Sequence, residues 1–329
     1  MKQRFFIMLA TCLMLGSLAV SARTIQGQVK GANKPLGGVL VTDGFSFTTT
    51  DAKGGYTLDL NEKAEFVYIV TPKGYVADFS SGVPQFYQRL EEGKDAYTFA
   101  LQEMNGDKDR YTMITMTDPQ LDTPEDAEKL MGETLKDIQE TAKEHQGVQL
   151  AGIVLGDISW DVYSNNEKYK QFARQLGFPV YPVIGNHDFD KYLTPSDDAD
   201  YTHQYKKDFG PVYYAFQLSD AYYVVLNNMY YAGNKHYRVT LDKMPDQMHW
   251  LEQLLNSALN MGNRIYICMH SPLKFSSESG LIGGGQHLKD MLDNKLPLDD
   301  DNTVKRLYRW FNIEYDNGTR IISGFSLNH

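Results

Sequence analysis

The chain has 329 residues, enough for one large and one small domain. Hydrophobic residues at 42% and charged residues at 22% are ordinary for a globular protein. The formal net charge of −10 argues against nucleic-acid binding through a basic surface, and so disfavours a nuclease. An anionic substrate stays open, because a bound metal ion can reverse the local field.

The first residues have the pattern of a secretory signal. Lys2 and Arg4 precede the apolar run 5–18, and V-S-A at 20–22 is a small-residue cleavage site. The apolar run is short for a full membrane span, which makes a membrane anchor the weaker interpretation. We therefore expect a signal peptide over residues 1–22, export to the periplasm or the extracellular space, and no membrane span after processing.

Residues 24–102 alternate apolar and polar side chains in the manner of β-strands. The runs TIQGQV, GVLVTD, FSFTTTD, GYTLDL, EFVYIVTP and AYTFAL are separated by Gly, Pro, Asn and Asp. Short strands at such close spacing predict a small all-β sandwich over residues 23–103. The polar, glycine-containing segment MNGDKDR is predicted to be a linker over residues 104–110.

From residue 111 the pattern changes to strands that alternate with helices. The helix over 123–145 is expected to have Thr123 as its N-cap and Pro124 in its first turn. This alternation predicts an α/β layered domain over 111–329, built on β-sheets flanked by helices. Further helices are predicted at 165–177, 244–260 and 302–312, strands at 111–118, 149–157, 178–188, 213–228 (two), 264–272 and 319–324, and a loop over the site at 273–303.

Polar residues follow four of the predicted strands. Asp118, Asp157, the pair Asn186 and His187, and His270 each come at a strand end. In open α/β sheets, ligands bind beyond the carboxyl ends of the strands. Oxygen and imidazole donors without thiolate suit Mn, Zn or Fe, and a carboxylate can bridge two ions. Two ions about 3.5–4 Å apart can clamp the attacking and leaving oxygens of a phosphoryl transfer.

These residues stand in an ordered set of motifs. The chain has D-P-Q at 118–120, G-D at 156–157, G-N-H-D at 185–188 and M-H-S-P at 269–272. The set resembles the calcineurin-like metallophosphoesterase superfamily, whose pattern is D-x-H, G-D, G-N-H-D/E, H and G-H-x-H at successive strand ends. The chain is also similar to the secreted subgroup that has an N-terminal β domain. The resemblance covers about residues 111–329, and it implies hydrolysis of phosphate mono- or diesters.

The resemblance implies a dinuclear metal site that binds two divalent or trivalent ions, Mn, Zn or Fe. Asp118 would bind the first ion and Asp157 would bridge both. Asn186 and His270 would bind the second ion. The implied substrate is a phosphorylated small molecule or another phosphoester.

The same resemblance gives His187 a catalytic role without metal ligation. His187 would face the phosphate, stabilise the transition state and protonate the leaving oxygen. Asp188 would orient the imidazole from behind, because a carboxylate on one ring nitrogen fixes which nitrogen carries the useful proton.

Two departures from the family pattern bear on activity. Gln120 stands where the superfamily usually has a ligating histidine, and three roles stay open for its amide oxygen: metal ligand, partner of a water, or neither. In the G-H-x-H position the chain reads G-F-S-L, so that Phe325 and Leu327 replace the two imidazoles. We therefore expect the domain to be C-terminally incomplete, and His329 to be a poor substitute ligand.

The remaining candidates have simpler interpretations. Asp161 fits either a supporting role behind the site or a turn. Cleavage of the signal would leave Cys268 as the remaining cysteine, so no internal disulfide is expected and this residue is interpreted as a small core side chain. Surface or capping roles are expected for the histidines without a matching motif, His145, His203, His236, His249 and His287.

Two functions of different classes therefore stay open. The first is an exported, metal-dependent phosphoester hydrolase. The second is a non-catalytic binding protein, in which the β domain engages a glycan or cell-surface partner and the α/β domain is an inactive remnant. The intact G-N-H-D favours the enzyme, the missing G-H-x-H favours the remnant, and the metal content of the purified protein discriminates between them.

Overall fold

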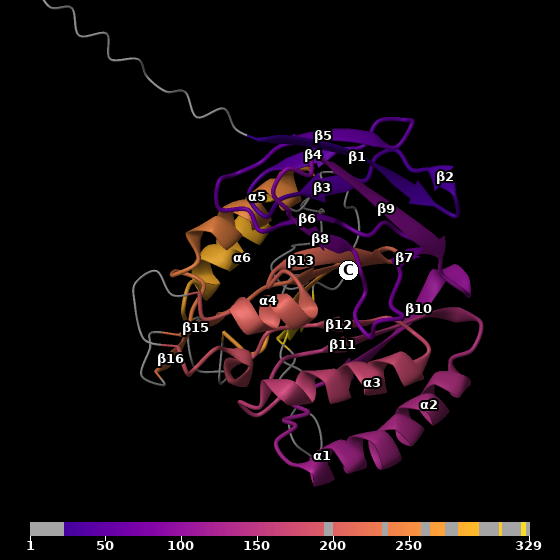
Figure 1. Ribbon diagram of the computed structural model, residues 1–329, viewed down its shortest axis with the longest axis vertical. Helices are drawn as coiled ribbons and strands as arrows, with labels where there is room; N and C mark the ends of the chain where they lie inside the picture. The colour runs from indigo at the N-terminus through magenta and orange to yellow at the C-terminus, as the bar shows by residue number, and fades with distance from the viewer. Residues whose placement is uncertain are drawn as a thin grey trace, which may run out of the picture.

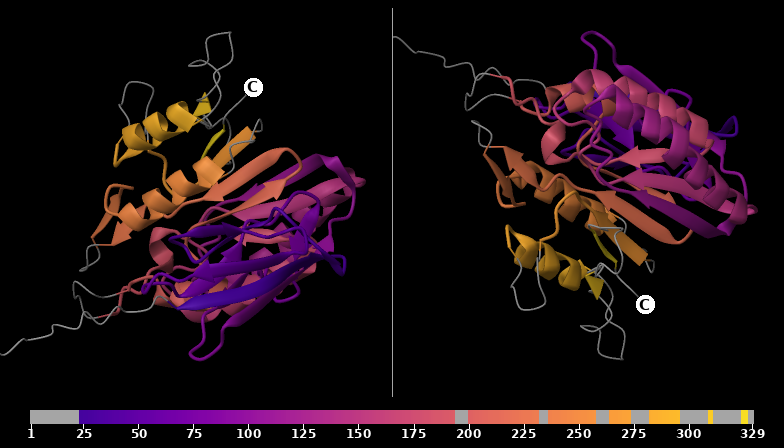
Figure 2. Two further views of the ribbon diagram at one scale, coloured as in Figure 1. Left: turned by 90° about the horizontal axis from the view of Figure 1, so that it is seen from above. Right: turned by 90° about the horizontal axis from the view of Figure 1, so that it is seen from below.

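The computed structural model describes residues 23–193, 200–231, 236–257, 264–273, 282–295, 309–310 and 324–326. The predicted signal at residues 1–22 lies outside these described residues, as do residues 327–329. Within the described ranges, every helix is too short or too polar to cross a bilayer. Figures 1 and 2 show the N-terminal strands gathered on one side of a mixed α/β region.

The N-terminal part of the chain is all-β, as predicted from its alternating pattern. One of its sheets has the order β2-β1-β9-β7, with β5 also paired to β1, and the second sheet has the order β4-β3-β6-β8. Alternate side chains of the long strands are buried, which is the period expected of strands with one covered face. The strands are β1 (Thr24–Gly31), β2 (Lys34–Pro35), β3 (Leu40–Thr42), β4 (Phe47–Thr49), β5 (Gly55–Asp59), β6 (Phe66–Ile69), β7 (Tyr75–Ala77), β8 (Tyr87–Arg89) and β9 (Ala96–Glu103).

The segment predicted as a linker is mostly strand. β10 (Asp107–Met116) begins at Asp107, so only residues 104–106 connect it to β9. Asp107 pairs with Val148, and the register shifts before Tyr111 pairs with Gln149. Pairing with a neighbouring strand thus extends β10 into a polar run that local composition assigns to a linker.

The α/β region is layered. β10, β11 (Val148–Val154) and β12 (Val180–Pro182) form a parallel sheet. A second sheet has the order β13-β14-β17-β19-β18. Its strands are β13 (Tyr214–Leu218), β14 (Ala221–Val225), β17 (Arg264–Cys268), β18 (Arg309–Trp310) and β19 (Gly324–Ser326), while β15 (Met229–Tyr231) pairs with β16 (Tyr237–Val239).

The parallel sheet is buried on both faces. Along β11, Ala151 and Ile153 belong to the core shared with the second sheet, whereas Leu150 and Val154 belong to the core under the helices. Across the first of these cores, Tyr181 stacks on Phe216 with ring centroids 3.6 Å apart. The helices that contribute to the second core are α2 (Leu135–Glu144), α3 (Asn166–Leu176) and α4 (His203–Phe209), and α1 (Pro124–Lys129) precedes α2.

The helix predicted at 123–145 begins where its cap signal places it. The Thr123 hydroxyl accepts from the backbone N–H of Asp126, and the Asp126 carboxylate accepts from the backbone N–H of Thr123. The helix then contains a π-helical turn, Leu130–Thr134, between α1 and α2. The predicted helix at 165–177 is α3, which ends at Gly177 with φ of 79°, a conformation that glycine adopts without strain.

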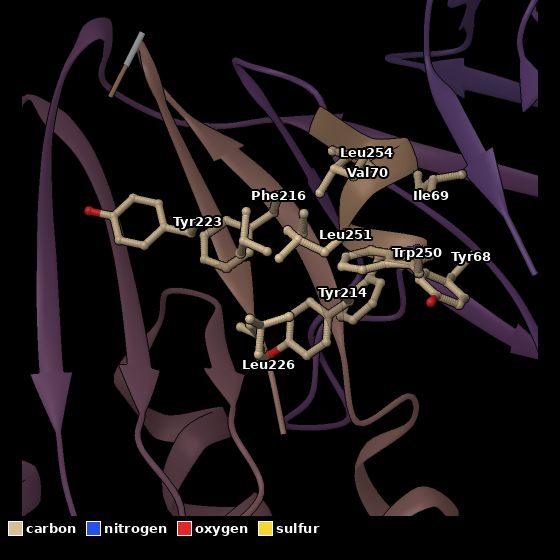
Figure 3. Packing of buried hydrophobic residues seen from close by; sticks show 14 of the residues in the cluster. Tyr68, Ile69, Val70, Tyr214, Phe216, Tyr223, Leu226, Trp250, Leu251 and Leu254 are labelled. Atoms are coloured by element: carbon tan, nitrogen blue, oxygen red, sulfur yellow. The ribbon is translucent and has the colours of Figure 1, made fainter. Parts of the chain in front are cut away.

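The N-terminal sheets pack directly on the α/β region. Figure 3 shows Tyr68 and Ile69 of β6 beside Trp250 of α5 (Pro245–Ser257), which in turn lies beside Tyr214 of β13. Trp250 is fully buried, and its ring lies 5.8 Å from that of Phe47. The two parts therefore share one hydrophobic core.

Two predicted elements near the end of the chain are wrong. Arg309 and Trp310 were expected in a helix, but they form β18, which pairs with β19. A helix, α6 (Gly285–Lys295), lies within the segment 273–303 that was predicted to be a loop. Its buried Leu288 and Met291 belong to the core that includes α5, so packing sustains a helix that begins in a glycine-rich run.

Candidate metal centre

The predicted ligands lie at the carboxyl ends of strands from both sheets. Asp118 follows β10, Asp157 follows β11, Asn186 follows β12 and His270 follows β17. β10, β11 and β12 are mutually parallel, so their carboxyl ends meet at one edge. His270 reaches the same edge from the second sheet, because its Nδ1 lies 2.8 Å from the carbonyl oxygen of Leu155.

Two glycines let the loops carrying Asp157 and Asn186 touch. A Cβ on Gly185 would lie 2.3 Å from both the backbone nitrogen and Oδ1 of Asp157. A Cβ on Gly156, where φ is 91°, would lie 2.7 Å from Nδ1 of His270. The glycines of the G-D and G-N-H-D motifs are therefore required by close approach of the backbone to ligand side chains.

The loops at this edge also hold non-glycine residues in the left-handed region. The φ angles are 46° at Asp118, 46° at Gln120, 52° at Asp157 and 59° at Asp161. Such conformations are uncommon and cost of order 1–3 kcal/mol each, and they cluster at functional sites. The surrounding contacts stabilise the loops in geometries that aim these polar side chains at one place.

The hydrogen bonds of His270 fix how its ring is used. The Leu155 carbonyl can only accept, so Nδ1 carries the proton and donates to it. In the neutral ring, Nε2 then has a free lone pair. This atom lies 3.1 Å from Oδ1 of Asn186 and 3.5 Å from Oδ1 of Asp157, which are also acceptors. A shared cation, either a second proton on Nε2 or a metal ion, would satisfy all three atoms.

Asp118, Asp157 and His270 together have the donor set of a metal site. Their ligand atoms all lie within 4.8 Å of one another. Partial burial raises the pKa of Asp118, and the nearby carboxylate of Asp157 adds to the rise. Two close carboxylates and an imidazole with a free nitrogen fit a divalent cation, which would relieve both the burial and the like-charge repulsion.

Gln120 contacts this cluster through its amide. Its Nε2 lies 3.4 Å from Oδ2 of Asp157, and its backbone N–H donates to the carbonyl oxygen of Asp157 at 2.9 Å. Ligation of a metal by the Gln120 oxygen stays a prediction, and what the structure shows is a contact with the carboxylate of Asp157. The amide is a donor here, which orients Asp157.

Asp188 was predicted to orient the imidazole of His187, but its hydrogen bonds go elsewhere. Its Oδ1 accepts from the backbone N–H of Ile158 at 2.9 Å, and its Oδ2 accepts from that of Gly185 at 2.8 Å. The side chain is buried, with 3% exposed. Burial raises the pKa of Asp188 to about 7, and the charge of Asp157 is the next cause. Asp188 therefore holds the two ligand loops together rather than the histidine ring.

The carboxylate beside His187 is Asp161. Its Oδ1 lies 2.9 Å from Nδ1 of the ring, and Lys191 contacts both this oxygen and the ring nitrogen, the latter at 2.8 Å. A protonated Nδ1 donates to Asp161, whereas an unprotonated Nδ1 accepts from Lys191. In both cases Nε2 can carry a proton. The backbone N–H of His187 also donates to Oδ1 of Asp157 at 2.8 Å, which ties the ring to the ligand cluster.

Two known protein families match parts of the chain. Calcineurin-like phosphoesterase matches residues 122–314. The chain belongs to the calcineurin-like phosphoesterase family. The family described as the N terminal of calcineurin-like phosphoesterase matches residues 23–104, which cover the N-terminal strands of this phosphoesterase. None of the curated proteins matches the sequence.

Cys268 and the last predicted strand have structural roles or lie largely outside the described residues. Cys268 is buried and free, as a small core residue would be, and burial raises the pKa of its thiol to about 12. β19 begins opposite Cys268 and runs antiparallel to β17, so the backbone leads away from the His270 edge after Gly324. The predicted last strand at 319–324 lies outside the described residues except for Gly324.

Two residues that contact His187 have no role predicted from the sequence. Lys191 and Trp160 both contact His187, with the indole of Trp160 stacked on the imidazole at 3.5 Å between centroids and 18° between planes. Each lies within four residues of a motif residue, Lys191 after His187 and Trp160 after Asp157. Nearness to a motif could have marked these residues as part of the site. The sequence does not show, however, whether a loop residue beside a motif faces the site or the solvent.

Proposed function

We propose that the protein is a metal-dependent phosphoesterase that hydrolyses phosphate mono- or diesters at a dinuclear site. The observation that carries the proposal is the convergence of Asp118, Asp157 and His270, whose ligand atoms lie within 4.8 Å of one another. Membership of the calcineurin-like phosphoesterase family supports the reaction class.

The chain offers distinct oxygen and nitrogen donors for two ions. Asp118 would hold one ion, Asn186 and His270 the other, and the carboxylate of Asp157 would be shared between them. Bound Mn, Zn or Fe ions would supply positive charge against the phosphate oxygens and lower the pKa of the attacking water. Gln120 and the backbone N–H of His187 fix Asp157 from two sides, and the Leu155 carbonyl fixes His270.

His187 is proposed to protonate the leaving oxygen. As water adds to phosphorus and the bond from phosphorus to the ester oxygen breaks, that oxygen gains negative charge. A proton on Nε2 of His187 neutralises it, and the proton released by the attacking water restores the overall balance. Asp161 and Lys191 hold the ring by Nδ1, so that Nε2 is the nitrogen free for this transfer.

The alternative is a non-catalytic binding protein with a remnant of the site. The observation that favours it is the sequence G-F-S-L at 324–327, in which Phe325 and Leu327 occupy the positions of two imidazole ligands. On this alternative the purified protein contains no bound metal and hydrolyses no phosphoester. On the enzymatic proposal, Mn²⁺ binds and supports turnover.

The test is a hydrolysis screen over phosphate mono- and diesters with added Mn²⁺, run on the wild-type protein and on His187→Ala. The wild type is expected to turn over at least one ester. His187→Ala should lower kcat by about 10²–10⁴, the usual contribution of a general acid, while the metal content stays near that of the wild type. Loss of metal in the variant, or no turnover by the wild type in the presence of bound Mn²⁺, would contradict the proposal.

A further inference from the structure

Among the described residues, the exposed large hydrophobic side chains belong to the segments that follow Asp157 and His187. The large hydrophobic side chains that are exposed in this part of the chain are Trp160, Tyr192 and Leu193. Trp160 lies on the loop that carries Asp157, and the other two follow the loop that carries His187. Apolar side chains left exposed at one place on a soluble protein mark a binding surface more often than isolated ones do.

Trp160 has a defined geometry within this surface. Its indole lies nearly parallel to the His187 imidazole, at 3.5 Å between centroids, so the imidazole covers one face of the indole. The residue is 40% exposed, and the face of the indole away from the imidazole is the one left for a ligand. Its backbone N–H donates to the Leu121 carbonyl at 3.2 Å, which fixes the position of the residue at the site.

We propose that Trp160 is a specificity-determining residue that selects phosphoesters whose leaving group contains a planar aromatic ring. The inference rests on the proposed function of His187. A leaving oxygen that accepts a proton from Nε2 must come within about 2.6–3.2 Å of that atom. The group attached to this oxygen then lies at the imidazole edge, next to the indole, where an aromatic ring can stack or pack edge to face.

The charged groups nearby favour a neutral ring over a charged leaving group. Lys191 is 5% exposed and is engaged by Asp161 and the His187 ring, so it offers little charge to an incoming anion. Asp161 is itself the partner of these two groups. The surface open to a leaving group is thus aromatic rather than ionic. A phenolic ring and a nucleobase both meet this requirement, and the substrates of the test separate them.

The experiment compares how Trp160 variants change the preference among esters. Phenyl phosphate, adenosine monophosphate and glycerol phosphate, each offered as the monoester and as its methyl diester, are assayed with Mn²⁺. The variants are Trp160→Ala, Trp160→Leu, which keeps bulk without an aromatic ring, and Trp160→Phe, which keeps a ring. For each protein, the measured quantity is the ratio of kcat/KM for an aromatic ester to kcat/KM for the glycerol ester. Each variant's ratio is then compared with that of the wild type on the same esters, so the intrinsic difference in leaving-group reactivity cancels.

Trp160→Ala and Trp160→Leu should lower the aromatic-to-glycerol ratio of kcat/KM by about tenfold, which corresponds to the free energy of one good aromatic contact. Trp160→Phe should keep a ratio close to that of the wild type, because it keeps an aromatic ring. A fall for phenyl phosphate alone identifies the phenolic source, and a fall for adenosine monophosphate alone identifies the nucleobase source. A second readout is quenching of tryptophan fluorescence, which phenylphosphonate should produce in the metal-loaded protein and methylphosphonate should not. Trp160→Phe should abolish this quenching.

An unchanged aromatic-to-glycerol ratio of kcat/KM in Trp160→Ala would overturn the inference. This holds even if turnover of all esters falls equally because the imidazole has moved. That result would leave the proposed phosphoesterase function standing. Absence of turnover of every ester by the Mn²⁺-loaded wild type would contradict the proposed function itself, so the two failures are distinguishable.

Discussion

Two regions of the molecule bury aspartate in different surroundings. In the N-terminal sheets, Asp43 is 2% exposed, and backbone N–H groups occupy both of its oxygens: Phe45 and Ser46 donate to Oδ1 at 2.9 and 2.7 Å, and Asn61 donates to Oδ2 at 2.7 Å. At the metal centre, Asp157 is 3% exposed and accepts from the His187 N–H and the Gln120 amide, but it also lies against a second carboxylate, Asp118, and Nε2 of His270.

The difference teaches that burial alone does not mark a functional carboxylate. Asp43 ties a turn together, because its charge is compensated by hydrogen bonds from the backbone. The carboxylates of Asp118 and Asp157 lie close together around a histidine nitrogen that has no proton in the neutral ring. Such a cluster destabilises the metal-free fold, and a bound cation reverses the effect. The predictions below test this contrast, from the largest expected effect to the smallest.

Gly185→Ala should abolish measurable Mn²⁺ binding and turnover. The new Cβ would lie 2.3 Å from the backbone nitrogen and Oδ1 of Asp157, so the loop carrying a ligand has to move. The matched control is Gly132→Ala, where a Cβ would meet nothing within 4 Å. Calorimetric titration with Mn²⁺ should find binding in the control and none in Gly185→Ala. Equal binding in both would refute the close contact between the two ligand loops.

The metal-free protein should lose stability as pH rises toward neutrality because of Asp188. Burial raises the pKa of Asp188 to about 7 in the folded state, against about 3.9 in the unfolded chain. Because the folded pKa is the higher one, the stabilising contribution is complete below about pH 4 and is lost as pH rises through about 7, at most about 4 kcal/mol.

Urea unfolding in chelator at pH 4 to 8 measures this loss, and the difference between the wild type and Asp188→Asn isolates it from other titrating groups. The free energy of unfolding of the variant should change less with pH. Its amide also leaves one backbone N–H without an acceptor, which lowers the stability of the variant at every pH. A difference between the two proteins that does not change with pH would show that the carboxyl of Asp188 titrates alike in the folded and unfolded states.

Asp43→Ala should lower the free energy of unfolding by about 3 kcal/mol, because buried backbone N–H groups lose their acceptor. Mn²⁺ binding should persist, since Asp43 belongs to the turn between β3 and β4 and not to the ligand loops. Denaturant unfolding and metal titration of the same sample provide the two measurements. Loss of metal binding at temperatures where the variant is folded would contradict the separation of the two regions.

Thr123→Ala should have the smallest effect, about 1 kcal/mol of stability, because it removes the N-cap of α1. Turnover should stay near that of the wild type, since this cap contacts none of the proposed ligands. Thermal unfolding and the Mn²⁺-dependent assay check both parts. A large loss of activity would mean that α1 positions the Asp118 loop more directly than the contacts indicate.

The sequence predicted the parts of the fold and site that depend on local signals. Thr123 is a cap recognisable from its neighbours, and the G-D and G-N-H-D motifs follow apolar runs that become β11 and β12. Asp118 and Asp157 could be grouped because parallel strands end at one edge, and His270, which follows a strand of the other sheet, could be added because each of these residues follows a strand in the order of the motifs. That reasoning requires only the order of the strands, which is why it found a cluster that the structure brings within 4.8 Å.

The parts that were missed depend on contacts between distant segments. Asp161 and not Asp188 lies against the His187 ring, and two neighbouring residues in a sequence give no sign of which direction each side chain faces. The local sequence predicts a helix at Arg309 and Trp310, but these residues form β18 and pair with β19. Tertiary pairing overrides local preference in such cases, and one sequence does not contain that information in local form.

The most direct test of the metal centre is calorimetric titration of Mn²⁺ into the wild-type protein and into Asp157→Ala, with His187→Ala as the control that keeps every proposed ligand. The wild type and His187→Ala should bind Mn²⁺ with similar affinity, and Asp157→Ala should not bind it. Failure of the wild type to bind, or binding by Asp157→Ala with unchanged affinity, would contradict the assignment of Asp118, Asp157, Asn186 and His270 as a metal site.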